Sequence, residues 1–273
     1  MRLFAVIVLI LFCLGRASAQ STLTQNLSSA KPPQFSGNLG LSYNSNLYNA
    51  NSNQKLTSAS ADLVMNYRLK DANLLRAYLS GYKQFTQNEE WRANDGFVGW
   101  VNNRFWAKGE KYSLGQQVRL ILPLSRESLD RDHRYTGVSV VPVFNVTLTP
   151  SVVFIYQPQF IRNFHKYTVN EAGTNNTAWA MNQTFILSWS FLDAWYLQGI
   201  YVHGSAWNYQ GSKKDDTYQV GGELGRSLTQ TITLALGWSN AGALHNWENG
   251  NDQTIRVFDN STSTVYGSLY WIF

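Results

Sequence analysis

The chain has 273 residues, with 22 Lys and Arg against 17 Asp and Glu, a formal charge of +5, and one cysteine. Charged residues make up 14% of it, against a usual share of about 25%, and aromatic residues make up another 14%. The small excess of positive charge is too little to argue for a nucleic-acid-binding protein, and a single cysteine excludes a disulfide framework.

The first 19 residues have the pattern of a secretory signal peptide. Arg2 supplies the positive charge, and Leu3–Leu14 is an apolar run too short to cross a bilayer as a helix. Ala17-Ser18-Ala19 is a small-residue cleavage site, so the mature chain is predicted to begin at Gln20. The single cysteine, Cys13, lies inside this leader. The mature protein is therefore expected to be exported and to contain no thiol.

A polar segment, residues 20–34, follows the leader and predicts a flexible arm. After it, twelve stretches alternate apolar and polar side chains with a period of two, the pattern of a strand with one apolar face. They are predicted at 34–46, 56–70, 74–85, 96–106, 112–125, 136–148, 152–165, 177–191, 195–207, 218–228, 231–238 and 265–273. Residues 35–273 are therefore predicted to form one all-β domain.

The connections between these stretches alternate in length. Short turns are predicted at 71–73, 108–109, 149–151, 192–194 and 227–230. Longer polar loops lie between them, at 86–95, 126–135, 166–176, 208–216 and 239–263. Short turns at one end of the strands and long loops at the other are typical of a transmembrane β-barrel.

The last strand has five apolar or small residues on one face, and the chain stops on an aromatic ring. These residues are Val265, Gly267, Leu269, Trp271 and Phe273. The stretch resembles the C-terminal strand of bacterial outer-membrane β-barrel proteins. In that family the final aromatic residue and the alternate apolar positions are read by the assembly machinery. The resemblance therefore implies that Leu269, Trp271 and Phe273 form an assembly signal.

The resemblance also implies the overall organisation. We expect a single-chain, antiparallel transmembrane β-barrel of about twelve strands in the outer membrane, porin-like and in the size class of small channels. Its short turns and residues 20–34 would lie in the periplasm, and its long loops outside the cell. The implied partners are outer-membrane lipid and lipopolysaccharide, the barrel assembly machinery and small solutes, with no nucleic acid, cofactor or metal.

The spacing of tryptophans supports a membrane setting. Trp179 and Trp189 lie ten residues apart on one face. At ~3.3 Å per residue and a ~40° tilt, they are separated by roughly 25 Å along the membrane normal. That distance is the height of a barrel's apolar band between its two aromatic girdles.

Hairpin geometry predicts which residues face each other. The predicted pairs are Leu69 with Leu75, Met65 with Leu79, Trp189 with Leu197, Trp179 with Trp207, and Val220 with Leu236. Pro142 and Pro158 are also predicted to face each other, although neither can donate to a ladder. Two interpretations remain, a bulge that adjusts the twist, which is favoured, or a local opening of the sheet.

The opposite faces of the strands are predicted to line the barrel interior. Their charged residues are Asp62, Arg68, Arg76, Arg104, Arg119 and Glu223. In the predicted register Arg68 faces Arg76, with Arg104 nearby, and like charges in this position repel. One hypothesis is a basic constriction for anions; the other is that Asp62, Glu223 or the chain termini neutralise the arginines.

Inward-facing aromatic residues add bulk to the predicted interior. Tyr266, Tyr270 and Trp100 are among them, and so much bulk inside twelve strands predicts a narrow pore at most. The predicted function is a narrow passive channel for small polar solutes, with anions a possibility that the basic residues raise. A plugged barrel with a structural or adhesive role is an alternative.

A second alternative is an enzyme. His203-Gly204-Ser205 is predicted on the outer, lipid-facing surface, with Gln183 opposite His203. A His-x-Ser pair there is similar to the catalytic pair of outer-membrane phospholipases and lipid A deacylases, in which histidine acts as base for a serine nucleophile. The Asn-Gly that follows the serine in the phospholipases is replaced by Ala206-Trp207. A lipid-modifying hydrolase is therefore the less favoured prediction.

Overall fold

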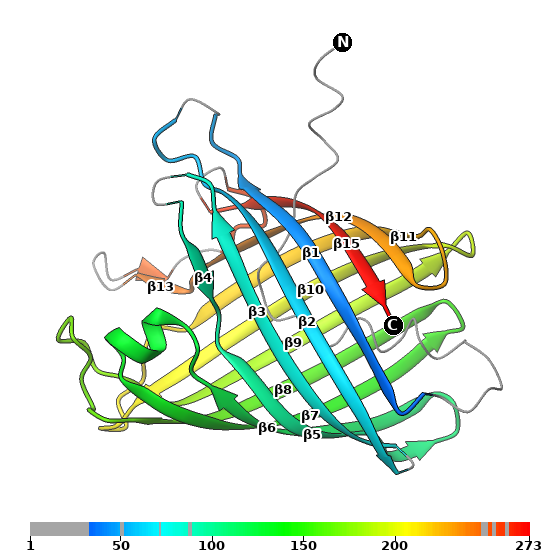
Figure 1. The fold of residues 1–273 in the computed structure, drawn as a ribbon, viewed down its shortest axis with the longest axis horizontal. Helices are drawn as coiled ribbons and strands as arrows, with labels where there is room; N and C mark the ends of the chain where they lie inside the picture. The colour runs from blue at the N-terminus through cyan, green and yellow to red at the C-terminus, as the bar shows by residue number, and fades with distance from the viewer. Residues whose placement is uncertain are drawn as a thin grey trace.

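The computed structural model describes residues 33–49, 52–70, 72–86, 89–246, 251–252, 255–259 and 262–273. The predicted signal peptide, and residues 20–32 of the predicted arm, lie outside the described residues. Twelve long strands form a closed antiparallel barrel, as predicted (Figure 1). They are β1 (Phe35–Asn46), β2 (Thr57–Lys70), β3 (Asn73–Gln84), β5 (Gly96–Lys108), β6 (Tyr112–Leu122), β7 (Arg134–Thr149), β8 (Val152–His165), β9 (Thr177–Phe191), β10 (Trp195–Asn208), β11 (Thr217–Ser227), β12 (Ile232–Ala243) and β15 (Thr264–Ile272).

The final strand closes the barrel. β15 pairs with β12 on one side and with β1 on the other, with Leu269 opposite Leu234 and Leu41. At the end of the chain the Gly37 N–H donates to the Phe273 carbonyl at 2.8 Å, and the Phe273 N–H donates to Gly37 at 3.1 Å. Because the barrel is closed, none of the twelve long strands forms a free edge of the sheet. A sheet needs this closure to be stable in the hydrocarbon core of a membrane.

The outer surface of the barrel is an apolar band. Large apolar side chains at alternate positions remain exposed, such as Leu187 at 50% and Leu236 at 49%. Trp179 and Trp189 are exposed on the same face of β9. A continuous apolar surface of this kind is unfavourable in water and suits a lipid environment. Within the described residues, no helix is long and apolar enough to cross a membrane.

The two ends of the barrel differ as the turn lengths predict. The tight connections lie at the end that carries the C-terminus, and the long loops lie at the other end (Figure 1). In the described parts of the loops, three short strands and one π-helix occur where no structure was predicted. They are β4 (Trp91–Ala93), η2 (Glu127–Arg131), β13 (His245–Asn246) and β14 (Asn251–Asp252).

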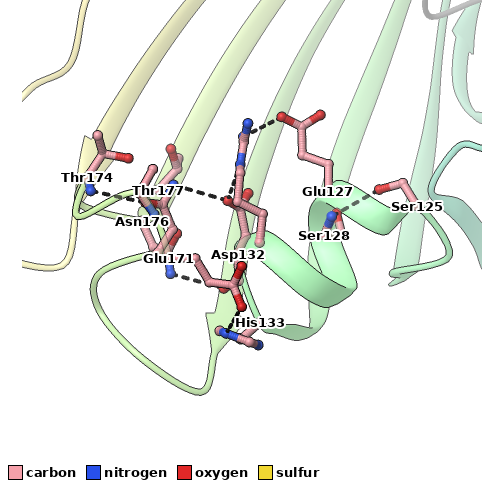
Figure 2. Close-up of polar contacts among 12 residues, drawn as sticks. Ser125, Glu127, Ser128, Asp132, His133, Glu171, Thr174, Asn176 and Thr177 are labelled. Carbon is pink, nitrogen blue, oxygen red and sulfur yellow. Dashed lines mark hydrogen bonds and ion pairs between the residues drawn. The ribbon is translucent and has the colours of Figure 1, made fainter. Parts of the chain in front are cut away.

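The loops after β6 and β8 are joined into one unit, shown in Figure 2. The Asn176 side-chain amide donates to the carbonyls of Asp132 and Tyr167 at 3.0 and 2.9 Å. The Glu171 N–H donates to the Arg131 carbonyl at 3.1 Å, and its carboxylate lies 3.5 Å from His133 Nε2. These bonds satisfy backbone groups that a loop of irregular conformation would otherwise leave to water.

Some predicted pairings hold and others do not. Trp189 faces Leu197 and Trp179 faces Trp207, as predicted. The other two hairpins are displaced. Between β2 and β3, Met65 faces Ala77, two positions from the predicted Leu79, and Leu69 does not pair with Leu75. Between β11 and β12, Leu236 faces Leu224, four positions from the predicted Val220.

The two strand prolines interrupt one ladder. Val140 pairs with Phe160 and Phe144 with Tyr156, so the register is the same on both sides of Pro142 and Pro158. No register shift occurs there, and the favoured prediction of a bulge is wrong. Since neither proline has an N–H, the ladder between β7 and β8 is locally open at this level, while Gln116 and Gln183 remain in register with the prolines on their other sides.

Candidate functional site

Two inward-facing arginines lie close together on the wall formed by β3, β5 and β6. Arg76 on β3 faces Gly99 on β5, and Gly99 faces Arg119 on β6. A Cβ at Gly99 would lie 3.2 Å from Arg119 Cγ, so the side chain of Arg119 extends over the glycine. The missing side chain therefore lets two guanidiniums approach each other across one strand.

Both guanidiniums bind neutral groups. Arg76 Nε donates to Asn66 Oδ1 at 2.7 Å, and Arg119 donates through Nε and a terminal nitrogen to Gln117 Oε1 at 3.1 and 2.7 Å. Arg119 is only 8% exposed, and its guanidinium lies 4.4 Å from the centre of the Phe97 ring. Among the described residues, neither arginine forms an ion pair with a carboxylate. Their positive charge is oriented by amides and an aromatic ring and is not neutralised by contact.

The predicted acidic residues bind tyrosine hydroxyls. Tyr78 donates to Asp62 at 2.6 Å, and Tyr196 donates to Glu223 at 2.7 Å. Glu223 is 6% exposed and lies on β11, separated from β3 and from β6 by four strands in each direction around the barrel. The buried carboxylate and the arginine pair therefore occupy opposite walls.

The wall around Glu223 is built from tyrosines that face glycines on the neighbouring strand. The pairs are Tyr196 with Gly225, Tyr266 with Gly237, and Tyr270 with Gly40. A Cβ at Gly225 would lie 2.2 Å from ring atoms of Tyr196, and one at Gly237 would lie 2.5 Å from the ring of Tyr266. The rings therefore lie flat against the wall. Tyr266 and Tyr270 take less of the interior than their size predicts.

Three other predicted interior residues lie elsewhere or have different neighbours. Arg68 faces Leu74, and Arg76 faces Asn66, so the predicted Arg68–Arg76 pair does not form. Arg104 is exposed in an irregular stretch of β5 where the register shifts, and does not join Arg76. Trp100 shares the outer face with its neighbours Leu75 and Val118, and its indole N–H donates to Asn73 at 3.1 Å. Both predictions are wrong. In the regular part of β5, Gly99 and Val101 face the interior, so Trp100 takes the outer face, and Arg104 lies beyond Asn102, where the register shifts.

The alternative enzymatic site assembles only in part. Gln183 faces His203, with Gln183 Nε2 3.4 Å from His203 Nδ1. His203 Nε2 lies 3.4 Å from Asp216 Oδ2, a residue that sequence reasoning missed because it belongs to the following loop. The Ser205 hydroxyl also acts on the Asp216 carboxyl and lowers its pKa. Both ring nitrogens of His203 thus face groups other than Ser205, namely Gln183 at Nδ1 and Asp216 at Nε2.

Asp216 behaves as the centre of a small ionic cluster. Burial alone would raise the pKa of its carboxyl, but Lys213 at 2.8 Å, the Ser205 hydroxyl and His203 outweigh burial and hold the pKa below its ordinary value. A nucleophilic serine needs the histidine itself as base. Here serine and histidine both face the carboxylate, an arrangement that holds the loop against β10.

Comparisons with known proteins agree with this fold. The chain is similar to an outer-membrane channel from Pseudomonas putida F1, with 13% identity, a TM-score of 0.61, and coverage of 89% of this chain and 97% of that one. It is also similar to the NanC porin, with 10% identity, a TM-score of 0.56, and coverage of 86% and 98%. No protein-family model and no curated protein matches the sequence. The chain therefore has the twelve-stranded barrel fold of bacterial outer-membrane channels.

Proposed function

We propose that this protein is a passive channel of the bacterial outer membrane for small polar solutes, with a preference for anions. The observation that carries the preference is the Arg76–Gly99–Arg119 row, in which two guanidiniums lie on one wall and neither is paired with a described carboxylate. A cation ring or cluster with spare hydrogen-bond donors attracts anions and partly replaces their hydration shell.

The size of the barrel supports passage of small solutes. Barrels of about eight strands have interiors that side chains fill, and barrels of 16–18 strands enclose wide aqueous channels. Twelve strands lie between these limits. The inward tyrosines of β10 and β15 lie over glycines, which favours a permeable interior more than upright rings would.

Planar-bilayer recording tests the proposal. In a salt gradient the wild-type protein should give open steps with a reversal potential of the sign expected for anions. The double variant Arg76→Gln and Arg119→Gln should move the anion-to-cation permeability ratio toward or below one, because the fixed positive charge is gone. Arg226→Gln is a matched control, since Arg226 lies on the outer face over Trp195 and should not alter selectivity.

Three results would contradict the proposal or its assignment to the arginines. A folded wild-type protein without open steps would exclude the channel. Open steps with unchanged selectivity in the double variant would be consistent with a channel but would exclude a role of the two arginines in its selectivity. A change in the permeability ratio in Arg226→Gln as large as that of the double variant would show that the effect is not specific to the inner wall.

Two further segments of the chain have proposed roles in export and in barrel assembly. We propose that residues 1–19 direct export with cleavage after Ala19, and that Leu269, Trp271 and Phe273 are recognised by the barrel assembly machinery. The support is that all three side chains are exposed on the outside of the closing strand. Phe273→Ala should lower the amount of folded protein in the membrane and leave refolding in detergent intact.

A further inference from the structure

Two guanidiniums are brought together on the inner wall with no side chain between them. Arg76 on β3 and Arg119 on β6 lie on either side of Gly99 on β5. Arg119 reaches over β5, because its guanidinium carbon lies 4.4 Å from the centre of the Phe97 ring and its Cγ lies 3.2 Å from where a Cβ of Gly99 would be. The charge of Arg76 acts on Arg119. The sheet therefore holds two like charges close together, although they repel each other.

Each guanidinium is held by one edge and keeps unused donors. Arg76 donates through Nε to Asn66 Oδ1 at 2.7 Å, and Arg119 donates through Nε and Nη2 to Gln117 Oε1 at 3.1 and 2.7 Å. Within the described residues, both terminal nitrogens of Arg76 and Nη1 of Arg119 make no hydrogen bond, and protein atoms do not enclose them. A guanidinium has five N–H donors in one plane. Most of these donors therefore remain available to a group in the barrel interior.

The groups around the two arginines add donors and rings. Arginine can only donate, so the amide oxygens of Asn66 and Gln117 must face it, and their amino groups make no hydrogen bond among the described residues. The Tyr78 ring stacks on Phe97 with ring centres 5.4 Å apart, and its hydroxyl donates to Asp62. Asp62 forms no ion pair with either arginine in the described part of the chain. A ligand at this point therefore meets positive charge and hydrogen-bond donors.

We propose that Arg76 and Arg119 form a binding site for a phosphate dianion, either free or as the monoester of a small polar solute. This inference deepens the proposed channel function and rests on it for access of the anion to the inner wall. The two guanidiniums hold one phosphate group over Gly99, each through its unused terminal nitrogens. The channel then retains one class of anion and does not merely attract anions in general.

Charge and shape favour phosphate over a carboxylate. Because no described carboxylate contacts Arg76 or Arg119, a dianion compensates both positive charges, whereas a monocarboxylate compensates one. A carboxylate has two oxygens in one plane and is matched by a single guanidinium. A phosphate group has three strong acceptor oxygens that do not lie in one plane with the phosphorus, so it can accept from two guanidiniums that approach from different strands. Gly99 leaves the space in which the group lies.

Isothermal titration calorimetry of the folded protein in detergent tests this site. Inorganic phosphate is the probe, at pH ~8, where a phosphate group carries nearly two negative charges. Phosphate should bind with a saturable isotherm. Acetate at the same ionic strength should bind about tenfold more weakly or less, because it engages one guanidinium. Glycerol 3-phosphate distinguishes the two sources of the group, since tighter binding than inorganic phosphate indicates an ester and weaker binding indicates the free ion.

Arg119→Lys separates a fitted site from a simple positive field. The lysine keeps the charge but loses the planar fork of donors. It should weaken phosphate binding about tenfold, the effect of losing one charged hydrogen-bonding partner. Arg76→Gln should weaken binding at least as much, because it removes both charge and donors. Arg226→Gln is again the matched control, since Arg226 lies on the outer face over Trp195, and it should change the affinity less than about twofold.

Calorimetry and bilayer recording give independent outcomes. Equal binding of acetate and phosphate, unchanged binding in Arg119→Lys, or an equal loss in Arg226→Gln would overturn the phosphate site in favour of a general attraction of anions. Anion-selective open steps without phosphate binding would overturn the site and leave the channel. Phosphate binding by a protein that gives no open steps would support the site and overturn the channel. Heat-dependent mobility on a denaturing gel confirms that each variant is folded before its binding is compared.

Discussion

The inner surface of the barrel has two unlike walls. On β3, β5 and β6, Arg76 and Arg119 lie on either side of Gly99 and bind only amides and a ring. On β10, β11, β12, β15 and β1, tyrosines lie over glycines, and the charge of Glu223 is met by a tyrosine hydroxyl. The first wall presents charge and the second wall presents a smooth aromatic surface.

Both walls depend on inward-facing glycines, which leave room for a side chain of the neighbouring strand to lie against the sheet. In a strand the usual effect of glycine is to weaken the sheet, unless a neighbouring group approaches closely and fills the space. At Gly99 that group is the stem of Arg119, and at Gly225 and Gly237 it is a tyrosine ring. The difference between the walls therefore depends on which residue faces each glycine, and the following predictions test that dependence.

The largest effect is expected at Gly225. Gly225→Ala places a Cβ 2.2 Å from ring atoms of Tyr196, so the ring must leave the wall. Overpacking of this kind costs about 1–3 kcal/mol of unfolding free energy. Urea titration in detergent, followed by tryptophan fluorescence, measures the loss, and a displaced ring should also reduce single-channel conductance.

Gly199→Ala is the control for this prediction. A Cβ at Gly199 meets nothing within 4 Å, although Gly199 lies on the strand that pairs with β11. The substitution should leave stability unchanged or raise it by up to about 1 kcal/mol through the unfolded chain. Equal losses in the two variants would mean that the flat tyrosines do not depend on their glycines.

A smaller effect is expected from the tyrosine hydroxyls. Tyr196→Phe removes the donor to Glu223 on the smooth wall, and Tyr78→Phe removes the donor to Asp62 beside the basic wall. Each lost hydrogen bond should cost about 1.5 kcal/mol, because the acceptor is charged. Tyr196→Phe should cost more, since Glu223 is almost fully buried and Asp62 is half-buried. Equal unfolding free energies of the two variants would show that burial does not distinguish the walls.

The sequence predicts well which residues of the two walls lie in strands and which face they take. It predicts less well which residues pair across neighbouring strands. Alternation decides which side of the sheet a residue faces, and a slip of one residue would reverse every face. A slip of two or four residues reverses none. The predicted pairings of Arg68 with Arg76 and of Val220 with Leu236 were wrong by such even slips.

The causes of these slips lie in the turns. Between β2 and β3 the register shifts from Arg68–Leu74 to Lys70–Asn73. Between β11 and β12, Thr229 Oγ1 accepts hydrogen bonds from the N–H groups of Thr231 and Ile232 and moves the centre of the turn. The Arg76–Gly99–Arg119 row and the tyrosine–glycine pairs depend on register, so alternation alone could not reveal them. Asp216 was missed for a related reason, because loop conformation brings it to His203.

The smallest effect is expected where the basic wall meets the loops. Asp95, just before β5, accepts from the N–H groups of Leu124 and Ser125 at 3.1 and 3.0 Å and from the Ser128 hydroxyl, and it lies 3.1 Å from Arg134. Burial alone would raise the pKa of Asp95, but these hydrogen bonds and the Arg134 charge outweigh it and hold the pKa below its ordinary value.

The sign of the pH dependence follows. A carboxyl with a lowered pKa contributes stability that is present above its unfolded pKa, about 3.9, and is lost as pH falls through its lower folded pKa. A spin label at Leu129, exposed in η2, should be immobile at neutral pH and become mobile in acid well below pH ~4. Asp95→Asn should make the label mobile at neutral pH.

A label at Thr229, in the turn between β11 and β12 on the smooth wall, is the control, because no described carboxylate takes part in the hydrogen bonds of that turn. Its mobility should not depend on pH or on Asp95. If the Leu129 label moved equally at pH 7 and pH 3 in the wild-type barrel, Asp95 would not be the group that holds the loop. Parallel changes at both labels would instead indicate general loosening of the barrel, and the two walls would then share one response to acid.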